Sequence, residues 1–226
     1  MKLSELLGDP SWLFDIGFPI KFVNDSKSFA KPDRLEWELD DSFRIPPFSS
    51  LADEKRFAEF SIGWNDNGLF LHGSIRRPES DSLSRGNRTI HMSLYIDTRW
   101  SPGVHRGTTY CHRFDFICEP TDSSEILKGH GELGAMQRAR ANPEAVHPKD
   151  ISVGLLARSF GYELKAFLRA DTLTGFDPRE FQEIGLFYVL QSQTLGSQCM
   201  ARSKNSPYFE DPSVWCRGKI IQPLAP

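Results

Sequence analysis

Residues 57–77 read FAEFSIGWNDNGLFLHGSIRR, and this stretch decides the fold class. Apolar side chains alternate with small or polar ones over 60–64 and again over 69–75. A period of two places one set of side chains on one face of a β-strand. The NDNG turn at 65–68 joins the two runs, and Asn and Gly tolerate the positive φ values of tight turns. The stretch therefore predicts a β-hairpin.

The same alternation recurs along most of the chain. Residues 121–150 have little apolar content and predict a long loop, with a short helical turn near Met136 to Ala141. About nine or ten strands without long helices favour an antiparallel β-sandwich, jelly-roll-like, with long loops and few short helices. The further strands are predicted at 20–23, 35–39, 89–99, 110–119, 184–190 and 214–221, with a second hairpin at 151–169 that turns at Ser159-Phe160-Gly161.

Length and composition favour one domain spanning 1–226. The chain is 39% hydrophobic and 12% aromatic, which suffices for a core without disulfide or metal support. No C-x-x-C pair occurs, so we expect free and mostly buried thiols. The odd spacing of the first two cysteines places them on opposite faces of one strand. The four cysteines are Cys111, Cys118, Cys199 and Cys216.

The charge balance excludes two classes of partner. A formal net charge of -3 and a pI near 6.1 indicate no nucleic-acid partner and no membrane surface. The first residues, MKLSELLGDPSWLFDIGF, carry Glu5, Asp9 and Pro10 where a signal peptide has an apolar run. The sequence as given therefore predicts a cytoplasmic protein, or a secreted one if a leader was removed. A carbohydrate or a protein surface remains as the partner.

Three segments in order resemble family 9 carbohydrate-binding modules and the wider DOMON-like sandwiches. They are residues 57–77, the strand RTIHMSLYIDTR at 88–99, and GYELKAFLRADTLTGFDPREFQEIGLFYVLQ at 161–191. The likeness covers about 34–217. It implies a β-sandwich that binds sugars, often with structural calcium, whereas related DOMON domains bind haem or sugars. Sugar-binding members clamp a pyranose between two aromatics, and the sequence alone does not match both.

Candidate ligand-binding residues gather near the end of the 89–99 strand. A sugar site needs an apolar platform and charged hydrogen-bond partners, which Trp100, Asp97 and Arg99 supply in a short span. If the strands at 89–99 and 110–119 pair, their polar side chains form one patch. The alternative is a surface ion pair beside a Trp that caps the sandwich. The candidates are Tyr95, Asp97, Arg99, Trp100, Tyr110, Arg113, Asp115, Tyr188 and Gln191.

No motif indicates catalysis or a resident metal. There is no G-x-S-x-G elbow, no phosphate-binding glycine loop, and no zinc spacing among the six histidines. Calcium is left open, because clustered oxygens suit it, although turn formation also explains these residues. The oxygen-bearing candidates are Asp40, Asp41 and Asp66 with Asn65 or Asn67, and a haem-type site would use a strand histidine with Met92.

The sequence therefore predicts a non-catalytic, carbohydrate-binding-like module that uses one sheet face and its flanking loops. It implies no cofactor. A cytoplasmic protein-interaction domain is the alternative. A sugar-acting hydrolase is third, because only scattered carboxylates support it.

Overall fold

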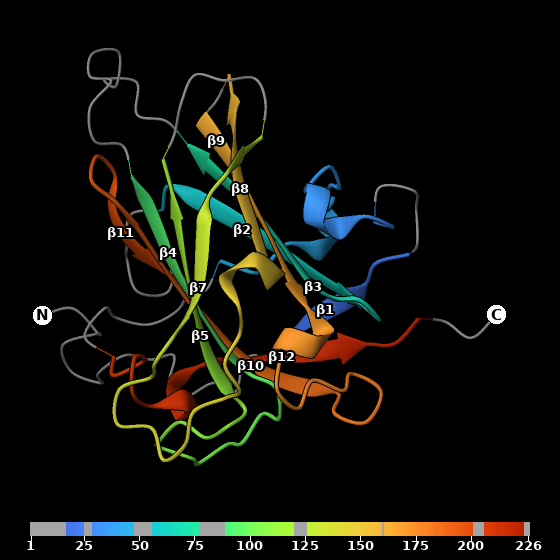
Figure 1. Cartoon of the computed structure of the whole chain (residues 1–226), viewed down its shortest axis with the longest axis vertical. Helices are drawn as coiled ribbons and strands as arrows, with labels where there is room; N and C mark the ends of the chain where they lie inside the picture. The colour runs from blue at the N-terminus through green and yellow to red at the C-terminus, as the bar shows by residue number, and fades with distance from the viewer. Residues whose placement is uncertain are drawn as a thin grey trace, which may run out of the picture.

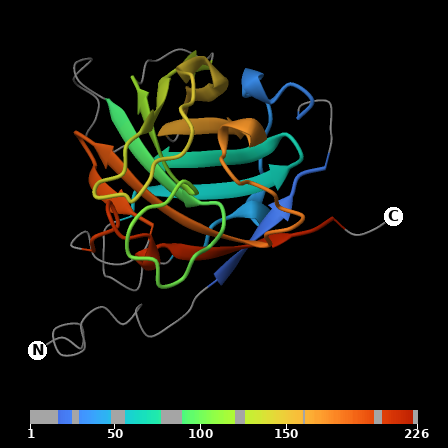
Figure 2. The ribbon, with the colours of Figure 1, turned by 60° about the horizontal axis from the view of Figure 1, so that its bottom comes forward.

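The computed structural model is a β-sandwich (Figures 1 and 2). It describes residues 17–24, 29–47, 56–76, 89–119, 126–159, 161–200 and 206–223. The strands are β1 (Gly17–Phe22), β2 (Ala58–Asn65), β3 (Gly68–Arg76), β4 (Ile90–Asp97), β5 (Cys111–Cys118), β6 (Leu127–Lys128), β7 (His130–Gly134), β8 (Ile151–Arg158), β9 (Gly161–Arg169), β10 (Glu183–Ser192), β11 (Gly196–Cys199) and β12 (Cys216–Ile221). Single-turn 3-10 helices occupy η2 (Pro32–Arg34), η3 (Asp41–Phe43), η5 (Pro148–Asp150), η6 (Ala170–Thr172) and η7 (Pro212–Val214).

Hydrogen bonds join the strands in the order β6-β8-β9-β3-β2-β1-β12-β10-β4-β5-β7, with β11 on β10. In Figure 2, β4 and β10 cross in front of β2 and β3, so the sheet folds over into two layers. The expected all-β sandwich is confirmed. The sheet is mixed rather than purely antiparallel, because β1 runs parallel to both of its neighbours, β12 and β2.

The segment from β6 to β7 brings the two ends of this sheet together. β6 pairs with β8, whereas β7 pairs with β5 at the other end of the strand order. Between them, the Gly129 N–H donates to the Val153 carbonyl at 2.9 Å. The sheet is therefore nearly closed, which leaves few unpaired edge groups.

The two predicted hairpins are confirmed. β2 and β3 pair from Ala58 with Ile75 to Asn65 with Gly68, and β8 pairs with β9 in the same way. Asn65 Oδ1 accepts the Asn67 N–H at 2.9 Å, which stabilises the NDNG turn. Gly68 has φ 147°, and a Cβ there would lie 2.0 Å from the Leu168 carbonyl oxygen, so the turn requires glycine. Of the second turn, Phe160 lies outside the described residues.

Two local predictions were wrong. Residues 35–39 form no strand: Leu35 adopts φ 58°, and the segment after it lies across the sheet. Residues 136–141 form turns and bends instead of a helical turn. The expected loop at 121–150, whose first five residues lie outside the description, contains β6 and β7. Both strands are short, and β7 contains two glycines, so their pairing depends on the distant strands they meet.

The core has two parts, one on each side of β3 and β9. The larger part fills the space between the layers, where the rings of Phe60 and Tyr188 lie 4.5 Å apart. The smaller part lies on the outer face, where Trp37 packs against Phe70 with ring centroids 5.2 Å apart. Phe167 is 1% exposed because residues 29–43 cover it.

The four cysteines form no disulfide, as predicted. Cys111, Cys118 and Cys199 are buried, and Cys216 is partly exposed. In the described part of the chain, no helix combines the length and the apolar character that a membrane crossing requires.

Candidate functional site

Strand pairing places polar side chains together on the outer face of β10, β4 and β5. Ser93 lies opposite Asp115, and Gln191 lies opposite His91. The predicted pairing of β4 with β5 is confirmed. Side chains at paired positions lie on the same face of the sheet. The residues of this patch, here called the polar face, are His91, Ser93, Arg113, Asp115 and Gln191.

Asp115 is the centre of the polar face. Its carboxylate accepts hydrogen bonds from Ser93 Oγ at 2.5 Å and Arg113 Nη2 at 3.1 Å, and His91 Nε2 lies 3.5 Å away. Burial raises the pKa of Asp115, but the hydrogen bonds from His91, Ser93 and Arg113 outweigh it and lower that pKa overall. The side chain of Asp115 is 7% exposed, against 29% for Arg113 and 35% for His91. The buried carboxylate therefore orients two cationic or polar groups that reach solvent.

An aromatic border runs beside the polar face. The Tyr208 ring stacks on Phe187 with centroids 5.0 Å apart, and the Phe209 ring meets Tyr208 edge-on at 5.6 Å. Tyr208 also meets the Tyr95 ring at 5.7 Å, and Tyr95 lies opposite Arg113 in the pairing of β4 with β5. Phe209 is 37% exposed. The exposed Phe209 ring thus contacts Tyr208, which adjoins the polar face.

Sequence analysis missed Tyr208 and Phe209. Their only local signal is an aromatic pair just before DPSVW, at 211–215. That pair is far from β5 in the chain, and only tertiary packing brings Tyr208 within 5.7 Å of the Tyr95 ring.

The predicted tyrosines of β4 and β10 are core residues. Tyr95 is 3% exposed, lies under Tyr208 and Trp215, and has a pKa raised by burial to about 12. Tyr188 faces the opposite side of β10 from Gln191, because an odd spacing inverts the face. Burial raises its pKa to about 12. Gln191 therefore lies on the polar face and Tyr188 does not.

The remaining candidates belong to the β4–β5 connection and its borders, where Tyr110 is 36% exposed. Asp97, expected on the polar side, is 2% exposed, and its oxygens accept the N–H groups of Arg99 at 3.0 Å and Ser101 at 2.9 Å. The Arg99 guanidinium lies between the rings of Phe181 at 3.5 Å and Tyr110 at 4.8 Å. Half-buried Trp100 adopts φ 40° in the same turn. These contacts are structural, but they differ from the predicted surface ion pair, because Asp97 is buried and its oxygens bind backbone N–H groups.

Asp97→Asn is expected to lower the free energy of unfolding by about 1–2 kcal/mol. In the variant an amide nitrogen takes the place of one carboxylate oxygen, and that nitrogen cannot accept the hydrogen bond of a buried backbone N–H. Burial raises the pKa of Asp97, so the substitution also removes a costly buried charge, which keeps the loss modest. Urea unfolding measures the effect. Ligand affinity on the polar face should stay unchanged, and a loss of affinity at full stability would contradict the structural role.

The calcium candidates have other partners. Asp40 Oδ1 accepts the Ser42 N–H at 2.7 Å, and both oxygens of Asp66 accept from Arg179 Nη2 at 3.0 Å. Among the described residues, no group of three or more His, Cys, Asp and Glu could hold a metal ion. His91 and Met92 point to opposite faces of β4, so they cannot ligate one group together.

Solved structures share this fold. A family 9 carbohydrate-binding module from Caldicellulosiruptor kristjanssonii in complex with cellotriose matches with a TM-score of 0.55 and 11% identity, over 93% of this chain and 100% of that chain. The same kind of module in complex with glucose matches with a TM-score of 0.56 and 10% identity, over 92% and 97%. No family model and no curated protein matches the sequence. The resemblance drawn from the three sequence segments is thus confirmed for the fold.

Proposed function

We propose that this chain, which has the fold of family 9 carbohydrate-binding modules, is a non-catalytic carbohydrate-binding module whose ligand lies on the polar face. The observation that supports this most is the Arg113–Asp115 pair beside an aromatic border, with Phe209 exposed. Sugar recognition combines an aromatic platform for C–H groups with charged partners for hydroxyls. This patch supplies both.

Each part of the patch has a distinct task. The exposed Phe209 ring offers apolar area to the C–H face of a pyranose, and Arg113 donates in a planar fork to neighbouring hydroxyls. The ion pair with Asp115 holds Arg113 in place before a ligand arrives, so little side-chain entropy is lost on binding. The solved neighbours hold cellotriose and glucose, which supports glucose-based sugars as first probes.

Arg113→Ala is expected to weaken sugar binding by about tenfold or more, because the variant loses two charge-directed donors. Isothermal titration calorimetry measures the dissociation constant with the best ligand from a panel of soluble glycans and insoluble polysaccharides. Phe209→Ala should weaken binding similarly while keeping the buried network intact.

Arg179→Ala is the matched control, since it removes an exposed arginine that is also paired with an aspartate, Asp66. Equal affinities in wild type and the Arg113 and Phe209 variants would contradict the proposed surface. Absence of detectable binding across the whole panel would contradict the proposed carbohydrate-binding function.

A protein-interaction module is the second candidate, and Ile117 favours it. Ile117 shares the outer face of β5 with Asp115 and is 37% exposed. Exposed apolar side chains on a strand face can mark a protein contact. Sedimentation velocity tests it: a stable dimer would favour this candidate, and a monomer that binds sugar would exclude it.

The Ser213–His105–Asp211 cluster does not support a hydrolytic role. His105 Nδ1 lies 3.1 Å from Ser213 Oγ and 3.0 Å from Asp211 Oδ2, so one ring nitrogen makes both contacts. A nucleophile relay needs the serine and the carboxylate on opposite ring nitrogens. Ser213 Oγ also donates to Asp211 at 2.6 Å. The geometry supports a hydrogen-bonded loop and a non-catalytic protein.

A further inference from the structure

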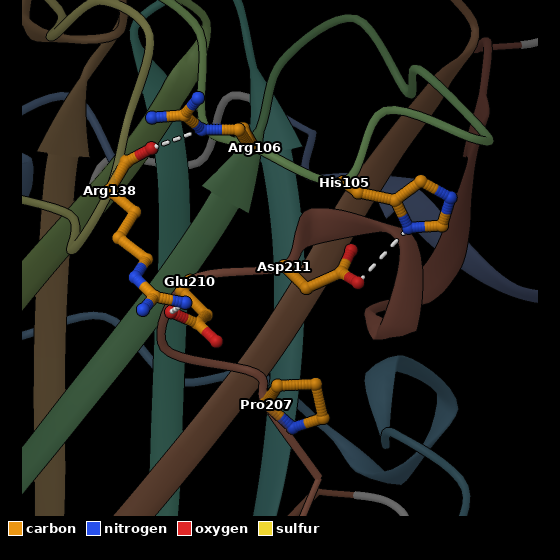
Figure 3. A pocket seen from close by; sticks show the side chains of 6 residues that line it. All are labelled: His105, Arg106, Arg138, Pro207, Glu210 and Asp211. Carbon is orange, nitrogen blue, oxygen red and sulfur yellow. Dashed lines mark hydrogen bonds and ion pairs between the residues drawn. The ribbon is translucent and has the colours of Figure 1, made fainter.

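A second concave site lies where three loops meet. The pocket has a volume of about 410 Å³, within the range of small-molecule sites. Its lining comes from the β4–β5 connection, the segment after β7, and the segment before η7 (Figure 3). The residues are His105, Arg106, Arg138, Pro207, Glu210 and Asp211.

Polar contacts between the loops give this pocket a defined shape. Arg106 Nε donates to the Arg138 carbonyl at 2.8 Å, and Arg138 Nη1 lies 3.3 Å from Glu210 Oε2. His105 Nδ1 lies 3.0 Å from Asp211 Oδ2. Figure 3 shows these pairs arranged around one space. Each contact joins two different loops, so the lining does not depend on a single segment.

The lining has a neutral balance of donors and acceptors. Both carboxylates have a cationic or imidazole partner, so neither favours a cationic ligand. In the described part of the chain, the terminal nitrogens of Arg106 make no hydrogen bond, and neither does Glu210 Oε1. A planar donor fork beside a carboxylate acceptor, with the apolar ring of Pro207, suits a neutral polyhydroxyl compound.

The pocket adjoins the polar face through the aromatic border. Pro207 lines the pocket and directly precedes Tyr208, which packs on Phe187 and on Tyr95, the residue opposite Arg113. Glu210 lines the pocket and directly follows Phe209. The exposed Phe209 thus stands in the chain between Tyr208, which its ring contacts, and the pocket residue Glu210.

We propose that this pocket is a second sugar subsite, so that the preferred ligand is an oligosaccharide that crosses Phe209 from the polar face into the pocket. This rests on the proposed carbohydrate-binding function. One sugar ring lies on the polar face, and a further ring donates and accepts hydrogen bonds at Arg106 and Glu210. Affinity then rises with chain length, because each engaged ring adds contacts.

The test is a calorimetric titration with one-, two-, three- and four-unit members of the β-1,4-linked glucose, xylose and mannose series. Wild-type affinity is expected to rise about tenfold or more from the single sugar to the trimer in at least one series. Arg106→Gln and Glu210→Gln should each remove most of that rise and leave the affinity for the single sugar unchanged. Arg140→Gln is the matched control, because it removes an exposed arginine from the segment after β7 without altering the pocket lining.

The possible failures are distinguishable. Equal affinity at all lengths, or a length dependence that persists in both pocket variants, would overturn the second subsite and leave the carbohydrate-binding function standing. Absence of binding by every member of all three series would overturn the subsite, and the function would fail with it only if the wider glycan panel also gave no binding. Equal losses in the Arg140 control and the pocket variants would show that the effect is not specific to the pocket lining and would overturn the subsite.

Discussion

Gln198→Ala should lower the free energy of unfolding by about 3–5 kcal/mol, since it removes hydrogen bonds from several buried groups at once. Gln198 is 0% exposed on β11. Its Oε1 accepts the N–H groups of Phe57 at 2.8 Å and Ala58 at 3.0 Å, and its Nε2 donates to the Ala58 carbonyl at 2.9 Å and the Tyr188 hydroxyl at 3.2 Å.

These bonds matter because β2 has few other partners on that side. β1 pairs with β2 only at Gly63 and Trp64. At the start of β2, the Gln198 amide therefore takes the place of a neighbouring strand. A methyl group offers no substitute, so buried backbone groups would be left without partners.

Urea unfolding measures the loss, with Gln137→Ala as the control at an exposed glutamine. Gln198→Glu should recover little stability, because it replaces the donor facing the Ala58 carbonyl with an oxygen and buries a charge. A loss below about 1 kcal/mol for Gln198→Ala would show that water or local rearrangement satisfies these groups.

Acidification from pH 7 to 4 should cost the protein about 3 kcal/mol of stability through His112 alone. His112 is 0% exposed, and burial lowers its pKa from 6.5 to about 4. Nδ1 lies 3.0 Å from the Tyr110 carbonyl, which must accept, and Nε2 accepts the Thr174 N–H at 2.9 Å. Both contacts are therefore satisfied by one neutral tautomer, and a second proton would break the bond to Thr174.

The direction of the change in stability follows from the number of protons that the folded and unfolded states bind. Between pH 6.5 and about 4 the unfolded chain protonates this histidine and the folded protein does not, so stability falls as the pH falls through this window. Below about pH 4 both states are protonated, and the contribution of His112 stays constant.

Other histidines titrate nearby, so the measurement compares slopes. Burial also lowers the pKa of His72, whereas the hydrogen bond to Asp115 raises that of His91. The free energy of unfolding is measured from pH 7 to 4 in wild type and His112→Gln. The variant should be less stable at pH 7 but lose less stability on acidification. Gln137→Ala, at an exposed position without a titrating group, should keep the wild-type slope, and parallel curves for the His112 variant would refute the assignment.

The polar face was partly predictable from local pattern. Period-two spacing places Arg113 and Asp115 on one face of a strand, and the pairing of that strand with 89–99 follows from two adjacent alternating runs. The same rule separates Tyr188 from Gln191, because their spacing of three residues is odd. Burial was not predictable in this way: Asp97 has the polar spacing, yet the turn that follows encloses it.

By itself, the sequence determined the hairpins at 58–76 and 151–169 and the faces of β4 and β5, because strand alternation and turn chemistry act between residues near in the chain. Only the tertiary structure decided that 29–43 covers the outer face, that Gly129 reaches Val153, and that Tyr208 meets Tyr95. These contacts join residues far apart in the chain. They depend on how the layers fold over and on which apolar surfaces remain uncovered, and no local period encodes either.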